Sequence, residues 1–274
     1  MLENIREQLK KWKSPTIDKN LKRDLKHGWL LPYLLELDYL CWRRWDYWLR
    51  TMQAGQLLDE LIPKIKFICE GTTETHKLPA RYHIESCLDL IARNWLGWSN
   101  WSDMEYFLDW LLYGLGYSGQ QELPKNSNTQ ASMALYQHFN LAFLIAYPFD
   151  YWGAILAANA FGRRLGFYPT PHCVVEAMVE MSFSDYEKDG VDSRIKTVCD
   201  PCLGTGRMLL FASNYSLRLY GADINSTLIK ASIVNGYLYA PWLVKPFPFL
   251  DESSLSPESS IVEGVDYQLE VVSQ

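Results

Sequence analysis

One eight-residue stretch, at positions 199–206, constrains the fold of this chain more than any other. It reads Cys-Asp-Pro-Cys-Leu-Gly-Thr-Gly and follows the β-type run 195–198. Gly204 and Gly206 have no Cβ, so they can take tight, left-handed conformations that other residues avoid. The apolar run 208–212 predicts a helix whose N-terminus faces the glycine turn. The free backbone amides there can donate hydrogen bonds to a ligand. The stretch therefore predicts a strand, a glycine turn and a helix that approach a ligand closely.

A second strand with an acidic end follows this unit. Residues 218–224 read Arg-Leu-Tyr-Gly-Ala-Asp-Ile and place Asp223 at the end of the strand. A carboxylate there can accept hydrogen bonds from both hydroxyls of a ribose. A dinucleotide is not the expected ligand, because its fingerprint Gly-x-Gly-x-x-Gly requires a third glycine where this chain has Leu209.

Several motifs in this region resemble those of the adenine-N6 DNA methyltransferases of type I restriction-modification systems. The similar segments, in chain order, are Asp150-Tyr151-Trp152-Gly153, Gly166-Phe167-Tyr168-Pro169-Thr170-Pro171, Asp200-Pro201-Cys202-Leu203-Gly204-Thr205-Gly206-Arg207-Met208-Leu209, Gly221-Ala222-Asp223-Ile224-Asn225 and Ala231-Ser232-Ile233-Val234-Asn235. The resemblance covers about residues 150–240, and the order and spacing of the motifs are specific together. The alternative is a glycine turn that merely connects a strand to a helix.

The resemblance implies an S-adenosylmethionine cofactor. It places the segment 168–171 over the methionine end, Asp200 and the two glycines around the methionine and sulfonium, and Asp223 on the ribose. The implied cofactor-binding residues are Tyr168, Thr170, Pro171, Asp200, Pro201, Gly204, Thr205, Gly206, Asp223 and Ile224. A cationic sulfonium beside Asp200 is favourable, and the methionine carboxylate suits the amides of the glycine turn. Arg207 departs from the small residue of the family, and we expect it either to crowd the cofactor or to point outward.

The catalytic motif of this family, Asn/Asp-Pro-Pro-Tyr/Phe, is missing. The chain contains no Pro-Pro pair, and the nearest segments, Ala240–Trp242 and Lys245–Phe249, offer no polar acceptor for an adenine amino group. The catalytic residues are therefore unknown. Three readings remain: a split methyltransferase completed by another chain, an inactive methyltransferase-like scaffold or interaction subunit of a nucleoprotein or defence complex, or an enzyme with a different catalytic constellation.

The expected fold class is α/β, with a helical, Trp-rich region at 1–117, a polar linker at 118–130 and a partial Rossmann-like methyltransferase unit at 131–274. Within that unit we expect a polar loop at 182–194, a helix near 227–239 and a strand near 266–272. An incomplete sheet has an unpaired edge and an uncovered face. A protein partner or a second copy of the chain is therefore expected to cover it.

DNA is a possible partner. Trp42, Trp45 and Trp48 share a helical stripe beside arginines, and this pattern fits a buried core, a protein interface or a nucleic-acid surface. Residues 1–27 carry eight Lys or Arg and read either as a basic arm or as the solvated face of an amphipathic helix. The net charge of −6 argues against a surface that is basic throughout.

No metal site, membrane span or leader segment is predicted. Cys199 and Cys202 have C-x-x-C spacing near His172-Cys173, but one is expected in a strand and the other in the glycine turn, which disfavours zinc. His172 is expected on the surface at a helix N-terminus. The apolar window 139–161 is broken by Pro148 and Asp150, so it predicts two buried helices. The cysteines show no disulfide framework, which favours a cytoplasmic protein.

Overall fold

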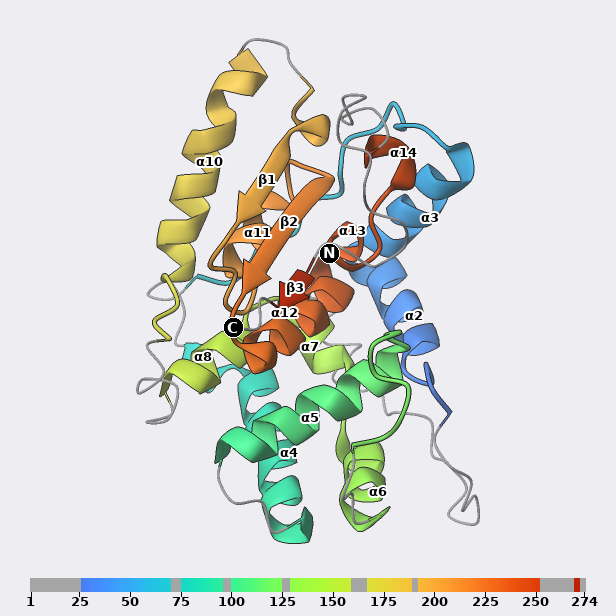
Figure 1. The fold of residues 1–274 in the computed structure, drawn as a ribbon, viewed down its shortest axis with the longest axis vertical. Helices are drawn as coiled ribbons and strands as arrows, with labels where there is room; N and C mark the ends of the chain where they lie inside the picture. Colours follow the sequence, from blue (N-terminus) through green and yellow to red (C-terminus); the bar gives the residue numbers. More distant parts are fainter. Residues whose placement is uncertain are drawn as a thin grey trace. The chain divides into compact units, whose positions relative to one another are not determined.

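The computed structural model describes residues 26–69, 75–95, 100–124, 129–158, 167–188, 192–251 and 269–271. The basic segment that we predicted as an arm or a helix lies almost entirely outside these residues. The described chain is mixed α/β, mostly helical, with a small parallel sheet (Figure 1). It divides into two compact units: a helical unit of residues 1–41 and 67–168, and an α/β unit of residues 42–66 and 169–274.

The helical unit is built around a cluster of aromatic rings. Phe107 and Trp110 both meet Phe139 edge to face with ring centroids 5.7 Å apart, and Phe107 contacts Trp152 in the same way. All four side chains are almost fully buried, and the Trp110 indole N–H donates to Ser132 Oγ at 3.0 Å. The elements of this unit are α2 (Leu31–Cys41), η1 (Thr75–Lys77), α4 (Pro79–Trp95), α5 (Asn100–Leu115), α6 (Thr129–His138), α7 (Ala142–Ala146) and α8 (Tyr151–Ala158).

The apolar window 139–161 forms two short helices, α7 and α8, as its sequence predicted. The helical conformation is interrupted between them at Pro148. Asp150 caps α8 by accepting a hydrogen bond from Gly153 N–H at 3.0 Å. Phe149 and Asp150 are both buried. No helix in the described part of the chain combines the length and the apolar character that crossing a membrane requires.

The described residues of the α/β unit form three parallel strands in the order β1-β2-β3. Its elements are α3 (Arg44–Ala54), α10 (His172–Lys188), η2 (Ser193–Ile195), β1 (Thr197–Asp200), α11 (Arg207–Ala212), β2 (Arg218–Asp223), α12 (Ser226–Tyr239), α13 (Pro241–Val244), α14 (Pro248–Asp251) and β3 (Leu269–Val271). The strand expected at 218–224 and the helix expected at 227–239 are confirmed, and the described residues 269–271 form a strand inside the range expected at 266–272. Because β1 and β2 are parallel neighbours, both strands end at the same edge of the sheet.

The two faces of the sheet differ in burial. The register pairs Val198 with Leu219 on one face and Cys199 with Tyr220 on the other. Leu219 is fully buried, whereas Thr197 and Cys199 are exposed and Tyr220 is half-buried. Parallel sheets are normally covered on both faces. One face at β1 is therefore open in the described structure.

The tryptophan stripe lies in the core of the α/β unit, as the first of our three interpretations held. Trp45 and Trp48 of α3 donate their indole N–H groups to the carbonyl oxygens of Tyr237, at 2.9 Å, and Lys245, at 2.6 Å. Arg44 is fully buried beside them and donates to Ser213 and to the carbonyl of Tyr239. Indole N–H groups and an arginine can be buried when carbonyl oxygens accept their hydrogen bonds.

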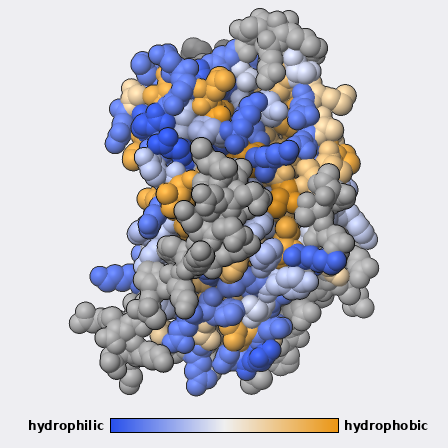
Figure 2. All heavy atoms as spheres, turned by 180° about the vertical axis from the view of Figure 1, so that it is seen from behind, coloured by the Kyte–Doolittle hydropathy of each residue, from blue (hydrophilic) through white to orange (hydrophobic). Residues whose placement is uncertain are grey.

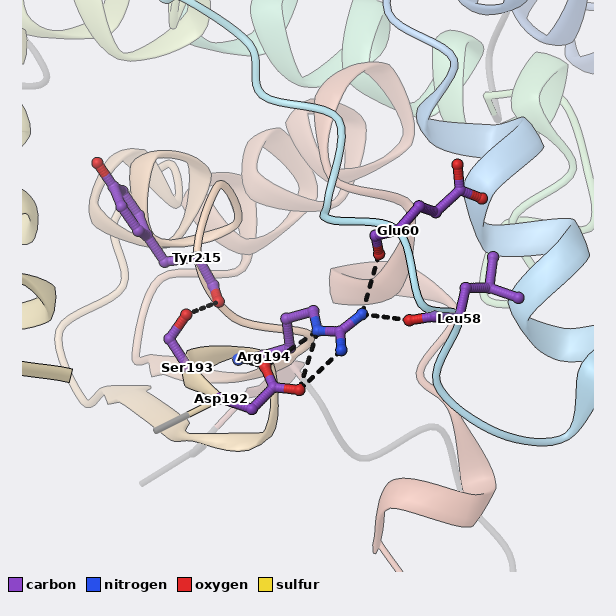
Figure 3. A network of polar contacts seen from close by, with 6 residues as sticks. All are labelled: Leu58, Glu60, Asp192, Ser193, Arg194 and Tyr215. Carbon is purple, nitrogen blue, oxygen red and sulfur yellow. Dashed lines mark hydrogen bonds and ion pairs between the residues drawn. The ribbon is translucent and has the colours of Figure 1, made fainter. Parts of the chain in front are cut away.

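Arg194 fixes the start of β1 (Figure 3). Its guanidinium forms an ion pair with Asp192 at 2.8 Å and donates to the carbonyl oxygens of Leu58 and Glu60 at 2.6 and 2.9 Å. Alongside it, Ser193 Oγ donates to the carbonyl of Tyr215 at 3.1 Å. The segment after α3 is thereby tied to the turn that leads into the first strand.

The polar loop predicted at 182–194 is wrong over its first part, because α10 continues to Lys188. Phe183 is buried and stacks on Tyr215, with ring centroids 4.9 Å apart and an interplanar angle of 13°. This contact with the segment before β2 stabilises another turn of helix. The polar residues around Phe183 are compatible with a helix that presents them to solvent.

Candidate functional site

The glycine turn follows β1 and is held against β2. The backbone N–H of Leu203 donates to the carbonyl of Ala222 at 2.9 Å, and the N–H of Gly206 donates to the carbonyl of Leu203 at 2.9 Å. Gly204 and Gly206 have φ angles of 57° and 81°, in the left-handed region that favours glycine. The strand, the glycine turn and the helix α11 thus occur where the sequence predicted them.

Gly206 is also required by packing between helices. A Cβ at this position would lie 3.1 Å from the Cβ of Ser232 on α12, which is tighter than ordinary van der Waals contact. Close by, the carbonyl of Thr205 accepts a hydrogen bond from Asn235 Nδ2 of α12 at 2.9 Å. Thr205 is 2% exposed, so this residue holds the turn to α12 rather than lining an open surface.

Asp223 connects the two strand ends. Its Oδ2 accepts a hydrogen bond from the backbone N–H of Gly204 at 2.7 Å, and its Oδ1 accepts one from the N–H of Asn225 at 2.9 Å. A carboxylate has about four lone-pair directions, so these two bonds leave acceptor capacity for a ligand. The next residue, Ile224, is 80% exposed and offers an apolar surface directly beside the carboxylate.

Asp200 supplies a second carboxylate at the same edge. Its Oδ1 accepts a hydrogen bond from the backbone N–H of Cys202 at 3.1 Å. Burial raises the pKa of Asp200 above the usual carboxyl value; the Cys202 hydrogen bond partly opposes this and the negative charge of Asp223 adds to it. A bound cation would offset both the cost of burying the Asp200 charge and its repulsion by Asp223. The electrostatics therefore favour a positively charged ligand atom at this edge.

Arg207 brings an upstream motif to the glycine turn. The Nη1 atom donates to the carbonyl of Thr170 at 2.6 Å, and the side chain is 5% exposed. The outward-pointing alternative for Arg207 is therefore wrong. This contact places Thr170 and Pro171 beside the N-terminus of α11, so one predicted segment reaches another. Tyr168, which is 74% exposed, is grouped with the helical unit.

His172, which we expected on the surface, is fully buried. Its ring lies against Phe211 of α11, with centroids 5.9 Å apart. The first residue of α10 therefore packs on the helix that follows the glycine turn. No local pattern around His172 indicates its burial, because the contact joins residues on different helices.

Two residues that sequence reasoning did not assign to the site hold it in shape. Asn225 caps α12, with its side-chain oxygen accepting from the N–H groups of Thr227 at 3.0 Å and Leu228 at 3.2 Å. Asn235 secures Thr205, as described above. Both asparagines lie in motifs that carried the family resemblance, which was the available signal for them.

The two segments most similar to the missing catalytic motif each contain buried residues. Pro241, Trp242 and Phe247 are buried, whereas Pro248 is exposed. The Phe247 ring lies 6.4 Å from Trp48 of α3. These aromatic rings form core contacts in the α/β unit and are not free to stack on a base.

Cys199 and Cys202 are exposed and reduced. Neither belongs to a cluster of three or more metal-ligating side chains among the residues that the structure describes. Pro201, the remaining predicted site residue, lies exposed on the same turn.

A hollow of about 360 Å³ lies in the helical unit, and none of the predicted site residues lines it. Its lining includes the carboxylates of Glu105, Asp109 and Glu122. The predicted site residues lie instead at the glycine turn and the strand ends of the α/β unit, which we therefore take as the candidate site.

Comparison with known proteins gives no relative: no protein-family model, no curated protein and no solved structure matches this chain.

Proposed function

We propose that the α/β unit is a partial Rossmann-like module that binds S-adenosylmethionine at the ends of β1 and β2. One observation carries the proposal. Two carboxylates, Asp200 and Asp223, flank a glycine turn at the ends of adjacent parallel strands, and the pKa of Asp200 is raised by burial and by its neighbour. Such a pair suits a ligand that carries both a cationic centre and ribose hydroxyls.

The same charges argue against a dinucleotide or a nucleoside phosphate. A pyrophosphate at the N-terminus of α11 would meet the carboxylates of Asp200 and Asp223, and this repulsion would oppose the favourable helix dipole. Position 209, where a dinucleotide site requires a third glycine, is a fully buried leucine. S-adenosylmethionine has no phosphate and carries a sulfonium cation, so the acidic edge favours it.

Each part of the cofactor has a candidate partner. The ribose hydroxyls would use the remaining acceptor capacity of Asp223, and the adenine would rest on the exposed side chain of Ile224. The sulfonium would lie toward Asp200. The segment of Thr170 and Pro171, which Arg207 holds by a hydrogen bond, would close over the methionine end.

The acceptor side of a methyl transfer is not identified in this chain. We propose an adenine-N6 DNA methyltransferase-like protein that is incomplete as a catalyst by itself. The alternative is an inactive scaffold or interaction subunit of a nucleoprotein or defence complex, in which the module binds the cofactor without transferring its methyl group. In the methyl-transferring form, completed by another chain, the protein would contribute positioning and charge stabilisation at the sulfonium.

The unpaired edge of β1 supports a protein partner. Within the described residues, β1 pairs with β2 alone. The neighbouring helix α10 exposes Val174, Met178 and Met181, which lie one helical turn apart and are 45, 47 and 74% exposed. Figure 2 shows hydrophobic side chains along the upper right edge, where α10 of Figure 1 lies after the half-turn of the view. Exposed apolar stripes and free strand edges both favour association.

We propose one occupant for this edge: a different polypeptide that adds a strand beside β1 and carries an Asn/Asp-Pro-Pro-Tyr/Phe segment. A second copy of this sequence would not supply that segment, because it contains no Pro-Pro pair. Light scattering on the purified chain distinguishes the two. A monomer is expected, and a stable homodimer that Met178→Glu with Met181→Glu dissolves would overturn the proposed occupant.

Calorimetry tests the cofactor. We expect S-adenosylmethionine and S-adenosylhomocysteine to bind the purified chain and NAD not to bind. Asp223→Ala should weaken both cofactor affinities by at least about tenfold, because a ribose loses a charged acceptor. Asp59→Ala, at an exposed carboxylate of the same unit, should leave them unchanged. No binding up to millimolar S-adenosylmethionine would overturn the proposal and favour a scaffold without a cofactor.

A further inference from the structure

Two helices of the helical unit bring together three side chains that bind transition metals. His83 and Cys87 lie four residues apart on α4, and therefore on one face of it, while His138 is the last residue of α6. The ligand atoms of the three residues all lie within 4.8 Å of one another. Among the described residues, this is the one group of three or more His, Cys, Asp or Glu side chains whose ligand atoms lie close enough to hold a metal ion. All three residues belong to the helical unit.

Hydrogen bonds orient the His138 ring with a nitrogen lone pair available. Ser86 Oγ lies 2.7 Å from the carbonyl oxygen of His83, to which it donates, and 2.7 Å from Nε2 of His138. In the Nε2–H tautomer, His138 donates to Ser86 and carries its lone pair on Nδ1. Metal-binding histidines are commonly oriented in this way, with the second ring nitrogen donating to an oxygen.

The His83 ring is also held in place by its neighbours. Its Nε2 accepts a hydrogen bond from the backbone N–H of Asn140 at 2.8 Å, and its ring lies 5.2 Å from that of His138 and 5.0 Å from that of Phe143. A metal would take the lone pair that this N–H now occupies. One neutral hydrogen bond is a small loss against a metal–ligand bond.

We propose that His83, Cys87 and His138 form a binding site for a zinc-class divalent ion. One thiolate and two imidazoles are the ligands that zinc prefers, whereas calcium and magnesium prefer oxygen. Bond lengths of about 2.0–2.3 Å in a tetrahedron place ligand atoms roughly 3.4 Å apart, so the side chains need to close by little more than about 1 Å. His138 is exposed, so an ion can reach this ligand from solvent.

Binding would release one proton. Cys87 is fully buried and its thiol is protonated in the metal-free protein, so the ion displaces that proton to solvent as the sulfur–metal bond forms. The bound ion would cross-link α4 to α6, which already pack against each other. An ion that binds only the folded chain stabilises it by an amount that rises with the logarithm of the free ion concentration once the site is saturated.

Cobalt(II) added to the full chain, kept reduced with a phosphine, tests the proposal directly. We expect saturable binding of one ion per chain, a thiolate-to-cobalt charge-transfer band, the intense visible bands of tetrahedral cobalt, and loss of these bands when zinc is added. His138→Gln and Cys87→Ser should each weaken binding by at least about 100-fold, the upper end of what losing an outer-shell partner costs.

The controls address folding and the competing cysteines. Cys199→Ser with Cys202→Ser removes the exposed C-x-x-C pair and should leave the cobalt spectrum unchanged. Because Cys87 is buried and its substitution can perturb folding, the exposed His138→Gln carries the test, with circular dichroism as the check. Absence of saturable binding, or a spectrum that survives His138→Gln but not the Cys199/Cys202 change, would overturn the site.

Discussion

Asp223 and Gly204 are joined by a hydrogen bond between the Oδ2 carboxylate oxygen and the backbone N–H, 2.7 Å long. The bond links the end of β2 to the turn that follows β1. It fixes the position of the carboxylate that we assign to the ribose and stabilises the left-handed turn at Gly204. The stability of the turn and the proposed ligand binding therefore depend on the same side chain. For substitutions at Asp223, both stability and ligand affinity must be measured.

Asp223→Asn should destabilise the α/β unit by about 1–3 kcal/mol. An asparagine has one carbonyl oxygen for the N–H groups of Gly204 and Asn225, so its amide would oppose one of these donors. Urea unfolding measures the loss, with Asp59→Asn, at an exposed carboxylate, as the matched control. A stability equal to that of the control would mean that the two hydrogen bonds add nothing.

Gly206→Ala should destabilise the protein by about 1–3 kcal/mol. The alanine would take a positive φ, 81°, and its Cβ would lie 3.1 Å from the Cβ of Ser232. Adding Ser232→Gly removes the second atom of that contact and should restore part of the loss, while the backbone strain remains. Thermal or urea unfolding of the single and double variants measures the coupling. If the two substitutions show no coupling, the whole destabilisation by Gly206→Ala comes from the backbone strain of a positive φ.

Local patterns in the sequence predicted the elements of the candidate site. The β-type run and glycine turn before Met208, the second strand ending at Asp223 and the helix ending at Tyr239 all occur within one or two residues of expectation. These signals are local: the alternation of a strand, a glycine that permits a turn, and the periodicity of a helix. Whether the site holds a cofactor stays a prediction, because no ligand geometry follows from local pattern.

Contacts between distant segments could not be predicted. The Trp45 indole N–H bonds to a residue 192 positions away, and the Arg44 guanidinium to residues 169 and 195 positions away. The buried His172 and the extra helical turn at Phe183 depend on Phe211 and Tyr215 in the same way. A tryptophan stripe flanked by arginines has the same periodicity whether it packs inside or faces a partner.

Arg44→Met should destabilise the α/β unit by about 3 kcal/mol or more. The buried guanidinium donates to Ser213 Oγ, to two backbone carbonyl oxygens and lies 4.4 Å over the Trp242 ring, so its removal leaves buried acceptors without these donors. Arg50→Met on the exposed side of α3 is the matched control and should cost about 1 kcal/mol or less. Equal losses in the two variants would contradict the anchoring role of Arg44.

The pH dependence of stability should reveal the raised pKa of Asp200. Burial favours the protonated carboxyl in the folded chain, so the wild-type protein keeps this contribution at low pH and loses it as the pH rises through the raised pKa. Asp200→Asn, which can still accept from Cys202 N–H, should therefore be more stable than the wild type at neutral pH. The difference should vanish below about pH 4, where the unfolded carboxyl is also protonated.

The same variant separates stability from binding. If Asp200 faces the sulfonium, Asp200→Asn should reduce the preference for S-adenosylmethionine over the uncharged S-adenosylhomocysteine by at least about tenfold, because a charge-assisted contact is lost. Urea unfolding across pH 4 to 8 and calorimetry with both ligands measure the two effects on one pair of proteins. Asp59→Asn should change neither. If Asp200→Asn is more stable but its ligand preference is unchanged, burial does raise the pKa of Asp200, but Asp200 does not contact the sulfonium.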